Sequence, residues 1–91
     1  MQITTGSTPT VLFLLVSSTD SKTAATGKTP SVTLSKAGAA FAAATNSPAE
    51  VGSGFYRIAL TAAETDTAGA LALVATATGC DVWRDIHEVT A

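Results

Sequence analysis

The sequence predicts an all-β fold: one small antiparallel β-sandwich of six to seven short strands, with a single helical turn. Three observations lead to this fold class. Short segments that are apolar or that alternate between polar and apolar residues recur along the 91 residues, turn residues separate them, and no segment indicates a long helix. A chain of this length builds one core, so we expect one domain.

Residues 1–9 are polar and contain Gly6 and Pro9, so we expect an extended N-terminal arm ahead of a sandwich domain at residues 10–91. Chain termini are usually disordered unless a contact holds them. We therefore expect this arm to reach a neighbouring subunit. Its candidate contact residues are Met1, Gln2, Ile3 and Thr4.

The first strand of the domain is expected at residues 11–16, because this short run is continuously apolar and rich in β-forming residues. Such a run predicts a strand that is buried on both faces. Residues 17–28 are polar and predict a loop, and loops carry many of the binding surfaces of proteins. The candidate contact residues of this loop are Asp20, Lys22 and Lys28.

A β-hairpin is expected in the middle of the chain. Residues 31–36 alternate between polar and apolar side chains, which is typical of a half-buried strand. Residues 36–38 predict the turn, and residues 39–44 return as a second strand around Phe41. Residues 45–52 predict another loop.

The segment at residues 55–60 alternates again, which places Tyr56, Ile58 and Leu60 on one face of a strand. Gly54, just before it, is expected to turn with a positive φ, which glycine adopts without strain. Thr61 and Glu64 have the spacing of a capping box, which predicts the single helical turn.

Two further strands complete the predicted sandwich. Residues 70–78 form a long strand that begins after Gly69. Residues 82–89 form the last strand, with Trp83 on one face and Ile86 on the other. Short strands at this spacing, with turn residues between them, are typical of an immunoglobulin-like or similar sandwich.

The composition limits the classes of function. Ala, Thr and Ser make up nearly half of the chain, and only 13% of the residues are charged, about half the usual share. The net charge is −2 and the basic residues are scattered, which disfavours nucleic-acid binding because that needs a clustered basic face. An Ala-rich core buries little apolar area. We therefore expect a homo-oligomer, with a trimer as a candidate arrangement.

Neither membrane insertion nor secretion is indicated. No apolar run reaches the ~18 residues of a membrane span, and the N-terminus lacks the basic segment of a signal peptide. The chain has one cysteine, Cys80, so it has no internal disulfide and we expect synthesis in a reducing cytoplasm. One histidine and one cysteine cannot supply a structural zinc site, and we expect no metal and no cofactor.

Few residues indicate catalysis, and we expect no enzyme. His87 and Asp85 lie two apart on the predicted last strand, and we interpret them as a surface pair because no nucleophile elbow accompanies them. Cys80 has no activating neighbour, so we interpret it as a half-buried structural residue. Trp83, the only tryptophan, is either a core residue or an interface anchor.

Two stretches of the sequence carry specific motifs. Residues 29–41 read TPSVTLSKAGAAF and match a hairpin pattern T-P-x-V-x-(I/L)-S-K-x-G. Residues 52–73 read GSGFYRIALTAAETDTAGALAL and match G-x-G-(W/F)-Y-x-(I/V)-x-L-T-x-x-(D/E), followed by a strand that a glycine begins. Together these stretches resemble the small β-sandwich modules of tailed-bacteriophage virion proteins, and the resemblance covers residues 10–91.

The resemblance implies a virion structural protein without enzymatic activity. In larger relatives such a module ends a long fibre chain, whereas nothing follows Ala91 here, so we expect a capsid decoration or cement protein that binds and stabilises the head. Its location would be the virion, after synthesis in the cytoplasm of the host bacterium. Its partners would be the major capsid protein or other virion proteins, with neither nucleic acid nor a membrane.

Two alternatives remain open. The first is a neck, tail or baseplate adaptor or a fibre-attachment protein, which would be present in few copies. The second is a receptor-binding or glycan-binding module, which requires Trp83 or Tyr56 to be exposed beside polar loops.

Overall fold

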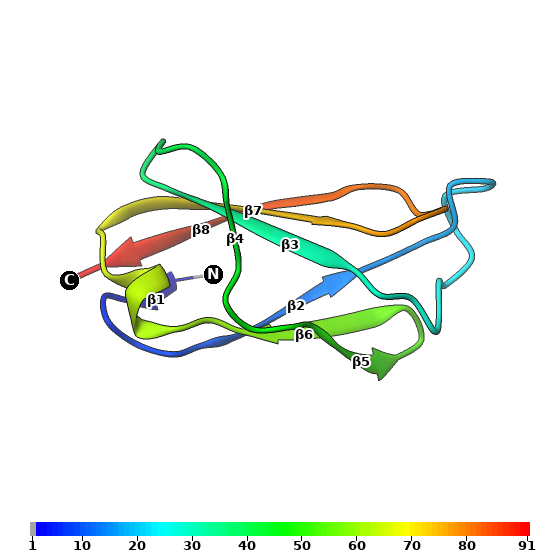
Figure 1. The fold of residues 1–91 in the computed structure, drawn as a ribbon, viewed down its shortest axis with the longest axis horizontal. Helices are drawn as coiled ribbons and strands as arrows, with labels where there is room; N and C mark the ends of the chain where they lie inside the picture. The colour runs from blue at the N-terminus through cyan, green and yellow to red at the C-terminus, as the bar shows by residue number, and fades with distance from the viewer. Residues whose placement is uncertain (1) are drawn as a thin grey trace.

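The computed structural model describes residues 2–91, which form two β-sheets packed face to face (Figure 1). The elements in chain order are β1 (Gln2–Thr4), β2 (Thr10–Leu14), β3 (Ser31–Lys36), β4 (Ala42–Ala43), β5 (Ala49–Gly52), β6 (Phe55–Ala59), the 3₁₀ turn η1 (Ala62–Thr65), β7 (Gly69–Thr76) and β8 (Trp83–Thr90). The larger sheet has the order β1-β8-β7-β3-β4 and the smaller sheet the order β2-β6-β5. The molecule is elongated, with extents of 39 × 22 × 19 Å.

The strand order is that of an immunoglobulin-like sandwich. In that fold, strands B, E and D lie in one sheet, and strands C, F and G lie in the other with C′ beside C. Here β2, β6 and β5 take the first set of positions, and β3, β7, β8 and β4 take the second. All neighbouring pairs are antiparallel except β1 and β8, which run parallel. The predicted all-β sandwich is therefore confirmed.

The core lies between the sheets and follows from the two-residue period of the strands. Side chains at alternate positions of β6, β7 and β8 are buried, and those between them face outward. Only two aromatic side chains are fully buried, and they are cross-strand partners: Phe13 on β2 and Tyr56 on β6. Their rings stack with centroids 5.8 Å apart and an interplanar angle of 14°. The remaining core side chains are aliphatic.

Tyr56 also fixes the loop at residues 17–28. Its ring is 1% exposed, and its hydroxyl donates a hydrogen bond of 3.0 Å to the carbonyl of Ala25. The same hydroxyl accepts a 3.0 Å hydrogen bond from the amide of Lys28. One side chain therefore fills the core and satisfies two backbone groups of the loop that would otherwise lack a partner.

Gly54 allows this loop to approach the sandwich closely. Its φ is +86°, and a Cβ atom at this position would lie 2.9 Å from the carbonyl oxygen of Leu15 and 3.0 Å from the Cβ of Ala24. Leu15 in turn donates a 2.9 Å hydrogen bond to the Gly54 carbonyl. A glycine is required here for two reasons, the positive φ and the lack of space.

Several local predictions are confirmed. Residues 31–36 form β3, a half-buried strand, and Tyr56 lies on the buried face of β6 as expected. The capping box is present: the Glu64 carboxylate accepts a 2.7 Å hydrogen bond from the amide of Thr61, and the Thr61 hydroxyl accepts one of 3.3 Å from the amide of Glu64. Glu64 also accepts a 2.9 Å bond from the amide of Thr45, which holds the preceding loop.

Other local predictions are wrong. The run at residues 11–16 is buried on one face only, because β2 has the core on one side and no layer on the other, so Leu12 is 51% exposed. The return strand of the hairpin is reduced to the two residues of β4, and Phe41 is 53% exposed. The segment predicted as a loop at residues 45–52 contains β5. Residues 2–91 thus form eight strands rather than six or seven.

The N-terminal segment belongs to the sandwich, so the expectation of an arm that reaches a neighbour is corrected for residues 2–4. Gln2–Thr4 form β1, which pairs in parallel with residues 88–90 of β8, and Ile3 is only 2% exposed. The following residues are also tied down, since the hydroxyl of Thr65 donates a 2.7 Å hydrogen bond to the carbonyl of Ser7. Ile3 is thus packed in the core of its own chain.

Substitution of Gly54 by alanine is expected to destabilise the fold more than the same change at Gly38. Both glycines have a similar positive φ, +86° and +88°, but a Cβ at Gly38 would meet no atom within 4 Å. The left-handed conformation costs an alanine about 1–2 kcal/mol at either position. The clash with the carbonyl of Leu15 should add about 1–3 kcal/mol at Gly54 alone. Urea unfolding of the two variants measures the difference, and equal losses would contradict the close packing of the loop.

Replacing Tyr56 by phenylalanine is expected to lower the free energy of unfolding by about 1–3 kcal/mol, because it leaves the Ala25 carbonyl and the Lys28 amide without their partner. Hydrogen exchange provides the specific measurement. The Lys28 amide should exchange faster in Tyr56→Phe, whereas amides in the middle of β7 should change only with global stability. An unchanged Lys28 exchange rate, relative to those β7 amides, would show that the hydroxyl does not hold the loop.

Candidate interaction surface

The residues predicted to make contacts lie in different parts of the molecule. Gln2 and Thr4 are exposed on β1 and Ile3 is buried, while Met1 lies outside the described residues. Asp20, Lys22 and Lys28 are exposed on the loop at residues 17–28, at the opposite end of the long axis (Figure 1). These residues therefore do not form one surface.

The loop at residues 17–28 is organised by its own side chains. The Asp20 carboxylate accepts hydrogen bonds from the Thr23 hydroxyl and from the amides of Thr23 and Lys22. These bonds, the one from the Thr23 hydroxyl first, lower the pKa of Asp20 from 3.8 to about 2. The oxygen atoms of Asp20 are thus used to shape the turn, which is the local role of an aspartate in such loops.

Trp83 is half-buried at the beginning of β8 and packs against the core. It lies on the inward-facing side of the strand, opposite Ala75 of β7. Its indole Nε1 is buried and has no hydrogen-bond partner among residues 2–91. The Trp83 side chain therefore packs mainly at the margin of the core.

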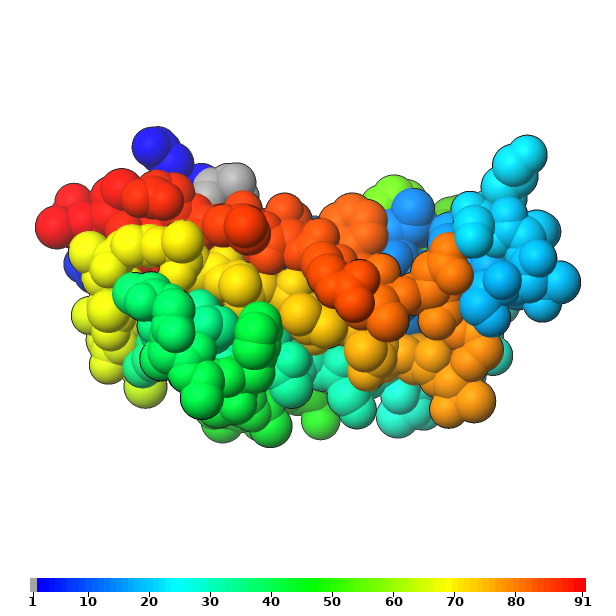
Figure 2. Space-filling model, turned by 90° about the horizontal axis from the view of Figure 1, so that it is seen from above, coloured from blue at the N-terminus to red at the C-terminus, as the bar shows by residue number. Residues whose placement is uncertain are grey.

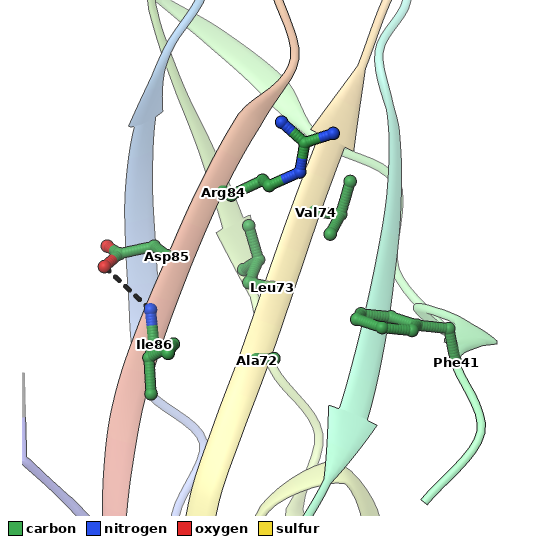
Figure 3. Close-up of a pocket in the computed structure, with 7 residues that line it drawn as sticks. All are labelled: Phe41, Ala72, Leu73, Val74, Arg84, Asp85 and Ile86. Atoms are coloured by element: carbon green, nitrogen blue, oxygen red, sulfur yellow. Dashed lines mark hydrogen bonds between the residues drawn. The ribbon is translucent and has the colours of Figure 1, made fainter. Parts of the chain in front are cut away.

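Apolar side chains are exposed on the outer face of the larger sheet. Figure 2 looks onto this face, where β8 and β7 (red to yellow) lie side by side with the hairpin segment (green) next to them. A shallow groove of about 560 Å³ crosses it (Figure 3). The groove is lined by Phe41, Ala72, Leu73, Val74, Arg84, Asp85 and Ile86.

The exposed apolar side chains of this groove come from three segments. Ile86 on β8 is 67% exposed and Phe41 after the hairpin turn is 53% exposed. Between them, Ala72 is the cross-strand partner of Ile86, and Val74 is the partner of Arg84. In Figure 3, Arg84 extends over Val74 at one end of the groove. An apolar surface of this kind with a charged margin is typical of a protein interaction site.

Charges of opposite sign flank Ile86 along β8. Arg84, Ile86 and Glu88 occupy every second position of the strand and so point to the same outer face. The intervening residues, Asp85, His87 and Val89, face the interior side. The face therefore carries a positive, an apolar and a negative side chain in that order, about 6–7 Å apart along the strand.

The outer face of the smaller sheet is also partly apolar. Leu12 on β2 is 51% exposed and Phe55 on β6 is 42% exposed. Leu12 lies opposite Arg57, and Phe55 lies opposite the partly exposed Leu14. The domain thus presents apolar side chains on both outer faces.

One backbone donor on the exposed edge of β8 is bonded to a side chain of the same strand. β1 pairs only with residues 88–90, so the edge of β8 before Glu88 lies beyond the end of β1. The carbonyl of Thr90 accepts a hydrogen bond from the amide of Thr5, so every second residue of β8, including Ile86, points its backbone groups to this edge. The Asp85 carboxylate accepts a 2.8 Å hydrogen bond from the Ile86 amide (Figure 3).

The interpretation of His87 as a surface residue is wrong. His87 shares the inward face of β8 with Val89 and is only 4% exposed, because strand alternation carries it under the sheet. Its Nε2 lies 3.6 Å from Oδ2 of Asp85, and neither ring nitrogen has a hydrogen-bond partner among residues 2–91. Burial lowers the pKa of His87 below 6.5, although the Asp85 carboxylate acts in the opposite direction.

The remaining chemical groups form no cluster in the described part of the chain. Cys80 is half-buried, and its Sγ lies 3.8 Å from the carbonyl of Thr78. Within residues 2–91, no three His, Cys, Asp or Glu side chains are grouped so that they could hold a metal ion. No helix in this range is long and apolar enough to cross a membrane.

Sequence reasoning did not select Phe41 or Ile86 as contact residues. A signal for Ile86 was present, since the alternation of the last strand placed it on the face opposite Trp83. Phe41 gave no such signal, because it was expected inside the second strand of the hairpin. Its exposure results from the shortness of β4, which begins only at Ala42.

We expect the stability of the protein to fall as the pH drops from about 7.5 to about 5.5. Because the pKa of His87 is lowered in the folded state, the unfolded chain binds a proton more readily below pH 6.5, and stability is lost as the pH falls through that range. His87 is the only histidine, so His87→Leu should remove most of this dependence. At the higher pH the variant should be no less stable, because it removes two buried nitrogen atoms that lack partners. Urea unfolding at both pH values gives the comparison, and an equally steep loss in His87→Leu would contradict this role.

The chain was compared with known proteins. No model of a known protein family matches it, and no curated protein sequence is significantly similar to it.

Proposed function

We propose that the chain is a structural protein of a tailed-bacteriophage virion, and that it binds the outside of the capsid as a decoration or cement protein. The observation that carries the proposal is the exposure of large apolar side chains on both outer faces of the sandwich: Phe41 and Ile86 on one face, Leu12 and Phe55 on the other. Exposed apolar surface with a polar rim is a feature of protein interaction sites. The resemblance of residues 10–91 to phage sandwich modules supplies the virion setting.

The size of the chain supports an assembly function. The Ala-rich core expected from the composition is not found, because only two of the buried hydrophobic side chains are alanines and the others are larger. A domain of 91 residues nevertheless has a small margin of stability. Burial of the outer faces against capsid subunits would add apolar area and stabilise both partners. The low charge content of 13% leaves few residues that would oppose such burial.

In this function the chain bridges neighbouring copies of the major capsid protein. Each sandwich would use one outer face for the capsid, and contacts between copies of the chain would extend the reinforcement across the lattice. Exposed Leu12 and Phe55 on the smaller sheet supply an apolar anchor, and Arg57 lies opposite Leu12. Apolar anchors beside an arginine are typical of the energetic centre of an interface.

A neck, tail or baseplate adaptor is the second candidate, since it would use the same apolar faces. Copy number separates the two, because capsid sites are far more numerous than neck or tail sites. A glycan-binding module has less support: Tyr56 is 1% exposed, and Trp83 packs against the core. Neither of the aromatic side chains on which that function depended forms an open platform.

The first measurement is the number of copies of this chain per purified phage particle, by quantitative mass spectrometry against the major capsid protein. We expect on the order of hundreds of copies, because a lattice protein follows the symmetry of the capsid. About a dozen copies would place the chain at the neck, tail or baseplate instead. Absence from the particle would overturn the virion function altogether.

A further inference from the structure

We propose that the outer face of the larger sheet is a homodimer interface, in which two copies of the chain pack this face against each other about a two-fold axis near Ile86. The proposal does not depend on the virion function, since it concerns only the surface of the chain itself. It also differs from the trimer considered from the sequence, because a two-fold contact uses the same face on both copies.

The apolar centre of the face fits a second sheet. Ile86 is the most exposed large apolar side chain of the described residues, at 67%, and Phe41 is 53% exposed across the groove. Ala72, between them, is small and allows the backbone of a partner sheet to come close. In packed β-sandwiches the side chains of two facing sheets interdigitate over about 10 Å.

The charges on β8 select one orientation. Aligned sheet packing keeps the strands of the two sheets within about 30° of each other, so the two β8 strands run either parallel or antiparallel. In the antiparallel case, with the axis at Ile86, Arg84 of each copy faces Glu88 of the other. In the parallel case Arg84 of one copy faces Arg84 of the other, and Glu88 faces Glu88, so both pairs repel. The order Arg84, Ile86, Glu88 is thus complementary to itself only under the antiparallel two-fold.

The size of the face is sufficient. The molecule measures 39 × 22 × 19 Å, so one of its long faces is on the order of the ~800 Å² that each partner buries in a standard interface. The other route to self-association, through the edge of β8, is less favourable because one of its backbone donors is occupied. There the Ile86 amide is already bonded to the Asp85 carboxylate.

Charge reversal tests the orientation. Sedimentation equilibrium of the purified chain should show a dimer, and Arg84→Glu or Glu88→Arg alone should raise the dimer Kd about tenfold, because each places two like-charge pairs in the interface. The double variant Arg84→Glu/Glu88→Arg should restore the original Kd. If the double variant is as weak as the single ones, the antiparallel arrangement is wrong. A chain that remains monomeric up to about 1 mM would overturn the interface itself.

Matched substitutions test which face is used. Ile86→Asp should abolish the dimer, whereas Leu12→Asp makes the same change at a similarly exposed strand position on the opposite sheet and should leave the dimer intact. The reverse result would assign the dimer to the smaller sheet and overturn the proposal. Thermal unfolding of each variant confirms that the fold is retained.

A cross-link provides a readout that does not depend on affinity. In the Cys80→Ser background, Ile86→Cys places one thiol per chain near the two-fold axis, where a bifunctional thiol-reactive cross-linker can join the two thiols across the ~10 Å between the packed sheets. We expect a covalent dimer from Ile86→Cys and none from Leu12→Cys in the same background. A cross-link only from Leu12→Cys would contradict the interface. Loss of the dimer and loss of capsid binding are measured separately, so either can fail alone.

Discussion

The Tyr56 side chain is the constraint on which the rest of the structure depends. Its ring stacks on Phe13 across the smaller sheet, and its hydroxyl bonds to both ends of the segment from Ala25 to Lys28. This arrangement holds the long loop against the sandwich, where Gly54 leaves room for it. One residue thus packs in the core and hydrogen-bonds the loop at the same time.

The strands with clear alternation could be predicted from the sequence, because each has one face on the core and one in solvent. β3, β6 and β7 are of this kind, and the capping box at Thr61 was equally local. β1 could not be predicted, since its three residues become a strand only through β8, which is distant in the sequence. β5 was missed although it pairs with the neighbouring β6, because its four residues show no alternation of burial and their register is interrupted between Glu50 and Gly52. The prediction for residues 11–16 failed for another reason. A continuous apolar run does not distinguish a strand that is buried on both faces from a strand that is buried on one face.

The candidate surface was harder to predict than the fold. Exposure of Ile86 depends on the absence of a layer above β8, which alternation alone does not reveal. His87 shows the opposite error, because residue type favoured the surface while the period of the strand placed the ring inside. The apolar and charged residues of β8 could be seen in the sequence. That they belong to a larger apolar face became clear only from the pairing with β7, which places Ala72 and Val74 beside them.

The bond between the Asp85 carboxylate and the Ile86 amide bears on how large an assembly can become. Pairing of sandwiches edge to edge has no natural end, since each added sheet presents a new edge, and it leads to filaments. A contact between faces about a two-fold axis is closed after two copies. By occupying one backbone donor on this edge, Asp85 disfavours such open-ended growth.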